Sequence, residues 1–153
     1  MDAEEIYKLY IQNNTKITID SRLLDLEDSV FFAIKGDNFD GHDFVEEALE
    51  KGAKIAIVDN PKKANESVII VDDTIKTLQE ISKIHREKYS INVIAITGSN
   101  GKTTTKNILT KILSSTYKVF STKGNFNNHI GLPLTILSLK KDHEIAVIEM
   151  GAN

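Results

Sequence analysis

The segment 93–105, VIAITGSNGKTTT, constrains the fold more than any other part of the chain. An apolar stretch runs into a glycine-rich turn, which is followed by Lys102 and three threonines that open a predicted helix. Glycines let the backbone approach phosphate oxygens, while a helix N-terminus and a lysine supply positive charge. The segment therefore predicts a loop that binds polyphosphate between a strand and a helix.

This loop departs from the general phosphate-loop pattern G-x4-G-K-[ST]. Only two residues separate Gly98 from Gly101, and Ile96 stands where the first glycine of the pattern would fall. We still expect phosphate binding, because the strand before the loop and the helix after it are the context that the pattern demands. The alternative is a glycine-containing turn with Lys102 exposed.

Composition and charge exclude several classes of protein. The 153 residues are 41% hydrophobic and 27% charged, which is typical of a globular protein, and no apolar run approaches the ~20 residues of a membrane span. The acidic N-terminus does not resemble a signal peptide. Cysteine is absent, which excludes disulfides and cysteine-ligated metals and agrees with a reducing compartment. We expect a cytoplasmic monomer without membrane insertion.

The charge is divided unevenly along the chain. Residues 1–89 carry 12 Lys or Arg and 19 Asp or Glu, whereas residues 90–153 carry 7 and 3, so the net charges are −7 and +4. A basic half that contains the phosphate loop suits an anionic nucleotide. Because no stripe of basic residues and no ladder of aromatics is visible, we do not expect nucleic-acid binding.

Alternating apolar patterns predict an α/β protein with parallel sheets. Predicted helices cover 3–11, 44–51 and 74–88, one follows Lys102 and one contains Pro133; predicted strands cover 17–19, 30–34, 55–58, 68–71, 93–97, 117–120 and 145–149. Polar turns are expected at 13–15 and 35–38. Asp43 and Asp73 are predicted helix N-caps, and Gly52 is predicted to follow a helix C-terminus.

We place a domain boundary at 89/90. Residues 1–89 are predicted to form a small N-terminal α/β domain, and residues 90–153 the start of a parallel-sheet, phosphate-loop ATPase domain. In the second part the helix after Lys102 is expected to bury Ile108, Leu109, Ile112 and Leu113. Three strands and two helices are few for an open parallel sheet. Either the N-terminal half completes the packing, or the chain is the front part of a longer protein, which is the interpretation we favour.

Five motifs in order resemble the Mur ligases of peptidoglycan synthesis. They are Asp20-Ser21-Arg22, DGHDF at 40–44, TGSNGKTTT at 97–105, GNFNNHIGLP at 124–133 and EMGAN at 149–153. The loop alone suits any Mur ligase or a folylpolyglutamate synthase, and the 40–44 segment also suits the member that adds the third residue. The last two motifs are most similar to the member that joins D-alanyl-D-alanine to UDP-N-acetylmuramoyl-tripeptide through an acyl phosphate.

The resemblance implies three domains, of which the chain matches the first and about the front third of the second. It also implies ATP and Mg²⁺ as cofactors, and a 153-residue chain that is inactive alone. The implied ATP-binding residues are Gly98, Ser99, Asn100, Gly101, Lys102, Thr103 and Thr104, with Lys102 and Glu149 catalytic. The implied metal ligands are Thr103 and Glu149, and His129 is implied either as a further metal ligand or in the substrate region.

For the UDP-sugar-peptide substrate, the resemblance implies Ser21, Arg22, Asp40, Gly41, His42, Asn125, Asn127 and Asn128. Each of these residues has a structural alternative. Arg22 could pair with Asp20 or Asp25 on the surface, Asp40-Gly41 could be a turn, and the asparagines could shape a loop through backbone hydrogen bonds. Glu149 ends an apolar run, where a carboxylate is costly to bury unless it is paired or bound to a metal. Two other classes stay open: another phosphate-loop nucleotide enzyme, and a non-catalytic UDP-sugar-binding module.

Overall fold

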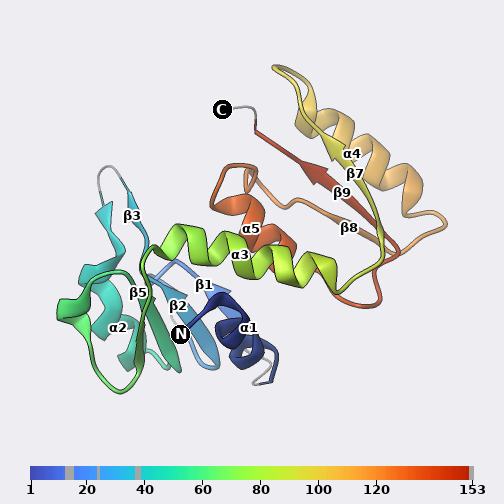
Figure 1. The fold of residues 1–153 in the computed structure, drawn as a ribbon. Coiled ribbons are helices and arrows are strands. Elements are labelled where there is room, and N and C mark those ends of the chain that lie inside the picture. The colour runs from blue at the N-terminus through green and yellow to red at the C-terminus, as the bar shows by residue number, and fades with distance from the viewer. Residues whose placement is uncertain (13–15, 24, 37–38, 152–153) are drawn as a thin grey trace. The chain divides into compact units, whose positions relative to one another are not determined.

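The computed structural model describes residues 1–12, 16–23, 25–36 and 39–151 (Figure 1). The chain forms two compact units, Met1–Ile81 and Ser82–Asn153, whose boundary falls inside helix α3 (Thr74–Glu87). The turn predicted at 13–15 and the centre of the turn predicted at 35–38 lie outside the described residues. Across the described ranges, no helix combines the length and the apolar character needed to span a membrane.

The first unit is built on a four-stranded parallel sheet in the order β1-β2-β5-β6. The strands are β1 (Lys16–Thr18), β2 (Ser29–Phe32), β5 (Ile55–Val58) and β6 (Val68–Ile70). Helices α1 (Ala3–Gln12) and α2 (Val45–Glu50) and the 3₁₀ turn η2 (Pro61–Lys63) belong to the same unit. The predicted parallel α/β architecture is confirmed.

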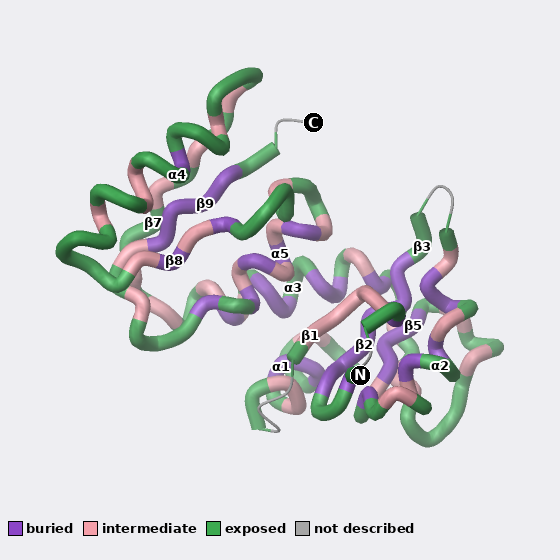
Figure 2. Tube along the Cα trace, turned by 180° about the vertical axis from the view of Figure 1, so that it is seen from behind, coloured by how far each residue is buried: buried purple, intermediate pink, exposed green. Residues whose placement is uncertain are grey.

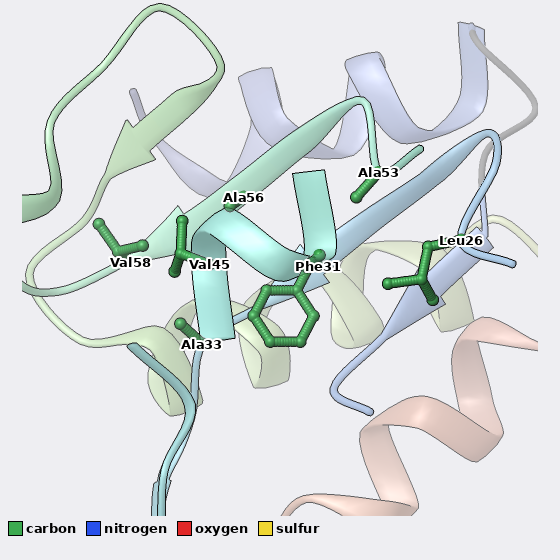
Figure 3. Packing of buried hydrophobic residues seen from close by; sticks show 8 residues of the cluster. Leu26, Phe31, Ala33, Val45, Ala53, Ala56 and Val58 are labelled. Carbon is green, nitrogen blue, oxygen red and sulfur yellow. The ribbon is translucent and has the colours of Figure 1, made fainter. Parts of the chain in front are cut away.

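Both faces of the two central strands, β2 and β5, are largely buried. Alternate residues of β2 and β5 point to one face and pack with α2 in a cluster that comprises Leu26, Phe31, Ala33, Val45, Ala48, Ala53, Ala56 and Val58 (Figure 3). Because side chains alternate along a strand, Phe32 and Ile57 point to the opposite face, and both are fully buried. The burial of both faces explains why these strands read as continuous apolar runs.

The segment between β2 and α2 differs from the prediction. The sequence analysis did not predict that β3 (Lys35–Gly36) and β4 (Phe39–Asp40) pair in antiparallel fashion, or that the 3₁₀ helix η1 (Gly41–Phe44) precedes α2. The prediction that Asp43 caps the helix is wrong. Asp40 caps η1 by accepting the His42 N–H at 3.0 Å, because the extra 3₁₀ turn moves the start of helical structure upstream.

The other two predicted helix ends are confirmed. Asp73 accepts the Lys76 N–H at 2.8 Å at the start of α3. Gly52 has a φ of +98° and donates its N–H to Leu49, while the Ala53 N–H reaches the Ala48 carbonyl. This pair of bonds closes α2, and the left-handed backbone it needs is the reason for glycine at that position.

The second unit holds a three-stranded parallel sheet in the order β7-β9-β8. It consists of β7 (Asn92–Ile96), α4 (Lys102–Leu113), β8 (Val119–Ser121), α5 (Gly131–Leu137) and β9 (Ile145–Glu149). The predicted strands and helices of this part are therefore confirmed. In the pairing of β7 with β9, Ile96 lies opposite Glu149, so the glycine-rich loop begins beside the carboxyl end of β9.

Helix α4 does not bury the face that its apolar pattern predicts. Ile108 and Ile112 are 56% and 62% exposed, so that part of the prediction is wrong. Figure 2 shows α4 as mostly exposed or intermediate along its length. The helix turns Lys106, which is buried, toward the interior, with Leu109 and Leu113 half-buried on the same side. These positions recur every three to four residues, and Ile108 and Ile112 lie on an adjacent face of the helix.

Candidate functional site

The glycine-rich loop joins β7 to α4 with a backbone that only glycine adopts readily. Gly98 and Gly101 have φ values of +142° and +75°. Gly101 stands immediately before α4, whose first-turn N–H groups have no acceptor inside the helix. Lys102 folds back so that its ammonium donates to the Gly98 carbonyl at 2.6 Å. The loop thus places backbone donors and a lysine together at a helix N-terminus, with Ser99 and Asn100 exposed between the glycines.

Glu149 ends β9 and points into a polar cluster at the start of α4. Its side chain is 3% exposed. The Thr103 hydroxyl lies 3.0 Å from Oε2 and 3.2 Å from Oε1, and the Asn127 side-chain amide donates to Oε1 at 2.8 Å. The structure therefore brings Thr103 and Glu149 together across 46 positions of sequence, as the sequence analysis expected of a shared metal site.

Two further residues, which the sequence analysis did not select, complete the cluster. Lys106 is buried; its ammonium donates to the Thr122 carbonyl at 2.8 Å and lies 3.7 Å from Glu149 Oε2. The Thr122 hydroxyl accepts the Glu149 N–H at 2.9 Å. Only the spacing in the sequence could have indicated Lys106. It follows Thr103 by three positions and so lies on the same face of α4.

The surroundings of Glu149 favour its ionised form. Burial raises the pKa of this carboxyl, but hydrogen bonds from Asn127 and Thr103, and then the positive charges of Lys106 and Lys102, lower it by more. The net effect is a pKa below the usual value for glutamate. A buried carboxylate that stays charged is suited to hold a cation.

The loop that contributes Asn127 begins after β8. Asn127 is tied to the end of β9 twice, since its carbonyl also accepts the Gly151 N–H at 2.7 Å. Asn128 accepts the N–H groups of Ile130 and Gly131 at 3.1 and 2.7 Å and so shapes the start of α5, which is the structural alternative weighed above. Asn125 and His129 are exposed. Among the described residues, no three His, Cys, Asp or Glu side chains gather into a metal site.

In the first unit, Ser21 and Arg22 follow β1. Arg22 forms a two-point ion pair with Asp20, with both N–O distances 2.8 Å, and the hydrogen bond from Arg22 lowers the pKa of the Asp20 carboxyl. This is the surface pairing that the sequence left open. Ser21 is buried, and its carbonyl accepts the Lys51 ammonium at 2.7 Å.

The Asp40-Gly41-His42 turn packs tightly into the same unit. A Cβ on Gly41 would lie 2.6 Å from the Ile34 nitrogen, so only glycine fits. His42 is buried, and its Nδ1 lies 2.6 Å from Asp40 Oδ1 and its Nε2 3.0 Å from Asp59 Oδ1. These contacts give the three predicted substrate residues a structural task inside the unit.

The residues of the second unit fit a nucleotide and a magnesium ion. Mg²⁺ takes hard oxygen ligands and keeps several waters, so the Thr103 hydroxyl and the Glu149 carboxylate can hold it together with phosphate oxygens. The loop N–H groups and Lys102 can hold the phosphates themselves. This arrangement suits phosphoryl transfer, in which catalysis consists mostly of positioning and charge stabilisation.

Comparison with protein families and solved structures agrees with this site. Residues 14–96 match the model of the Mur ligase family, catalytic domain, and residues 96–153 match that of the Mur ligase middle domain. The UDP-N-acetylmuramoyl-tripeptide–D-alanyl-D-alanine ligase of Bacillus subtilis is 47% identical, over 88% of this chain and 30% of the relative. The ligase of that name from Haemophilus influenzae is 44% identical, over 90% and 31%.

Solved structures give the same result. A crystal structure of MurF from Acinetobacter baumannii superimposes with a TM-score of 0.83 at 41% identity, covering 90% of this chain and 30% of that one. MurF ligase from Thermotoga maritima, solved in complex with ADP, gives 0.82 at 39% identity, covering 92% and 33%. The chain thus spans about a third of the length of the proteins it matches. Because a family model matches more than half of its residues, the chain belongs to the Mur ligase family.

Proposed function

We propose that this chain is the front part of an ATP-dependent ligase that joins D-alanyl-D-alanine to UDP-N-acetylmuramoyl-tripeptide. The observation that carries the proposal is the contact of Thr103 with Glu149 at the mouth of the glycine-rich loop. Relatives named for this reaction are 37–47% identical, which supports this member of the family over the one that adds the third residue. The ADP in the Thermotoga structure supports a nucleotide as ligand.

The chemistry needs a leaving group better than oxide on the substrate carboxylate, which an acyl phosphate made from ATP supplies. The attacking carboxylate and the γ-phosphate are both anionic, so the site must neutralise charge and fix geometry. Lys102 would leave the Gly98 carbonyl and donate to the β- and γ-phosphates, beside the N–H groups of Gly98 to Thr104. Mg²⁺, when bound, would offset the charge of the phosphate oxygens.

On the protein side, Thr103 and Glu149 would provide the Mg²⁺ ligands. Asn127 would orient the Glu149 carboxylate through its hydrogen bond. The sequence had instead suggested a contact of Asn127 with the substrate. Asn125, Asn128 and His129 would face the sugar-peptide substrate from the same loop.

For the UDP end of the substrate, we propose the surface around Ser21 and Arg22. The Arg22 side chain is 87% exposed even while paired, so its guanidinium can exchange Asp20 for a diphosphate oxygen. Asp40, Gly41 and His42 would shape this part of the unit from within, because their polar atoms are already engaged there.

The decisive test is Lys102→Ala in the complete ligase. Loss of a charged donor to phosphate should weaken binding of ATP at least about tenfold and abolish acyl-phosphate formation, while binding of the UDP-linked tripeptide stays intact. Isothermal titration calorimetry measures the two affinities, and trapping of the acyl phosphate measures the reaction.

Lys111→Ala is the matched control, since this lysine is exposed on the same helix. It should leave both measurements unchanged. Full turnover by Lys102→Ala would refute the proposal. Retained binding of the UDP-linked tripeptide by the unaltered protein, without any binding of ATP, would favour the non-catalytic binding module.

A further inference from the structure

Lys106 is a buried cation for which the proposed reaction gives no role. Its side chain is 5% exposed, and within the described part of the chain its ammonium donates one hydrogen bond, to the Thr122 carbonyl at 2.8 Å. A carbonyl offers only a partial charge, and a buried ammonium is costly unless a full negative charge compensates it. The carboxylate that does so is Glu149, which is equally buried.

The contact between the two charges is loose. At 3.7 Å from Oε2 the ammonium of Lys106 lies beyond hydrogen-bond distance, whereas the Thr103 hydroxyl lies 3.0 Å from the same oxygen. A carboxylate has about four acceptor positions, and the contacts with Thr103 and Asn127 leave room for a further ligand. Lys106 therefore neutralises Glu149 without blocking its access to a metal ion.

This arrangement has a consequence for metal binding. Without nucleotide, a divalent cation at Glu149 meets a carboxylate whose charge is already balanced, and it is repelled by Lys106 and by Lys102 nearby. Nucleotide phosphates bring several negative charges and reverse that balance. We infer that Lys106 is an internal counter-ion that makes metal binding at Glu149 conditional on bound nucleotide.

The inference rests on the proposed function, because it takes Thr103 and Glu149 as the metal ligands. It assigns Lys106 a positioning and selectivity task without direct contact with substrate. A purely structural task, tying α4 to β8 through Thr122, would predict equal or weaker metal binding when Lys106 is replaced. An internal counter-ion predicts tighter binding, so the direction of the change separates the two.

The experiment titrates Mn²⁺, as a paramagnetic substitute for Mg²⁺, into the protein with and without ADP and follows free Mn²⁺ by electron paramagnetic resonance. Lys106→Met removes the charge, and Lys106→Gln removes it while keeping a donor for the Thr122 carbonyl. In the absence of ADP, both should bind Mn²⁺ about tenfold tighter than the wild type, the size expected from removing one charge near a divalent ion. Lys106→Arg should restore wild-type behaviour, and Lys111→Met should not differ from it.

Circular dichroism establishes that the variants are folded, and Lys106→Gln alone is used if Lys106→Met is unfolded. If the folded variants without the Lys106 charge bind Mn²⁺ no more tightly than the wild type in the absence of ADP, the inference is wrong. Adding Glu149→Gln to either variant must abolish the gain. The same substitution in the wild type tests the proposed function separately. If Glu149→Gln leaves ADP-dependent Mn²⁺ binding intact, the proposed metal site is wrong. If it abolishes that binding while the Lys106 variants show no gain, only the counter-ion is wrong.

Discussion

Replacement of Asp59 by alanine should destabilise the first unit more than the loss of an ordinary helix cap. The Asp59 carboxylate accepts the N–H and the hydroxyl of Thr74, both at 3.1 Å, and lies 3.0 Å from His42 Nε2. Thr74 is 1% exposed, so its two donors would have no access to water. Unpaired buried donors cost about 1–3 kcal/mol, and loss of a helix cap costs about 1 kcal/mol. We expect Asp59→Ala to lower the free energy of unfolding by about 3 kcal/mol.

Asp73→Ala is the matched control, because Asp73 caps the same helix from an exposed position. It should cost about 1 kcal/mol. Urea unfolding followed by far-UV circular dichroism separates the two: with a slope of about 2 kcal/mol per M, the midpoints should fall by about 1.5 M and about 0.5 M. If Asp59→Ala costs no more than Asp73→Ala, the contacts of His42 and Thr74 with Asp59 do not stabilise the fold. That result would favour the substrate-binding role that the resemblance implied for His42.

Two further substitutions test backbone packing and pH dependence. Gly131→Ala should lower the free energy of unfolding by about 1–3 kcal/mol in thermal unfolding, because the new Cβ would lie 2.6 Å from Phe126 Cα. Gly36→Ala should change it little, because the nearest atom to its new Cβ would lie at 3.8 Å. Equal effects of the two substitutions would contradict this reasoning. The His42 N–H donates to Asp40 and lowers the pKa of that carboxyl in the folded state. The unfolded state therefore binds more protons as the pH falls. The stability that Asp40 contributes is present above pH about 4 and is lost as the pH falls through the folded pKa. Asp40→Asn keeps an acceptor for the N–H and should flatten the acid side of the stability curve; an unaltered curve would show that Asp40 does not contribute.

The elements of the fold were largely predictable because their signals are local. The apolar runs of β2, β5 and β9 and the caps at Asp73 and Gly52 each follow from a few neighbouring residues. The errors arose where tertiary contacts decide. Nothing local distinguishes Asp40 from Asp43 as a cap, and the apolar pattern of α4 is broad enough to leave open which side meets the sheet.

In the candidate site, too, some features could be predicted from the sequence and others depend on tertiary contacts. The juxtaposition of the glycine-rich loop with Glu149 could be predicted, because in a parallel sheet both lie at the carboxyl ends of strands, and the pairing of Ile96 with Glu149 has this result. The polar partners of Glu149 could not be predicted. Asn127 resembled a substrate ligand, and Lys106 was not selected, since neither burial nor a partner 22 or 43 positions away is visible in the sequence.

The contrast extends to charge. The sequence shows a basic second half and singles out Lys102 in the glycine-rich segment, but it does not show where the other lysines of that half lie. In the structure, Lys102 is the first residue of α4 and donates to the carbonyl of Gly98, which a phosphate oxygen can replace as acceptor. Lys106 is buried beside Glu149 and donates to the carbonyl of Thr122. One positive charge is free to exchange partners and the other is held in the fold. From this difference in burial we propose that Lys102 serves the nucleotide, whereas Lys106 serves the Glu149 carboxylate.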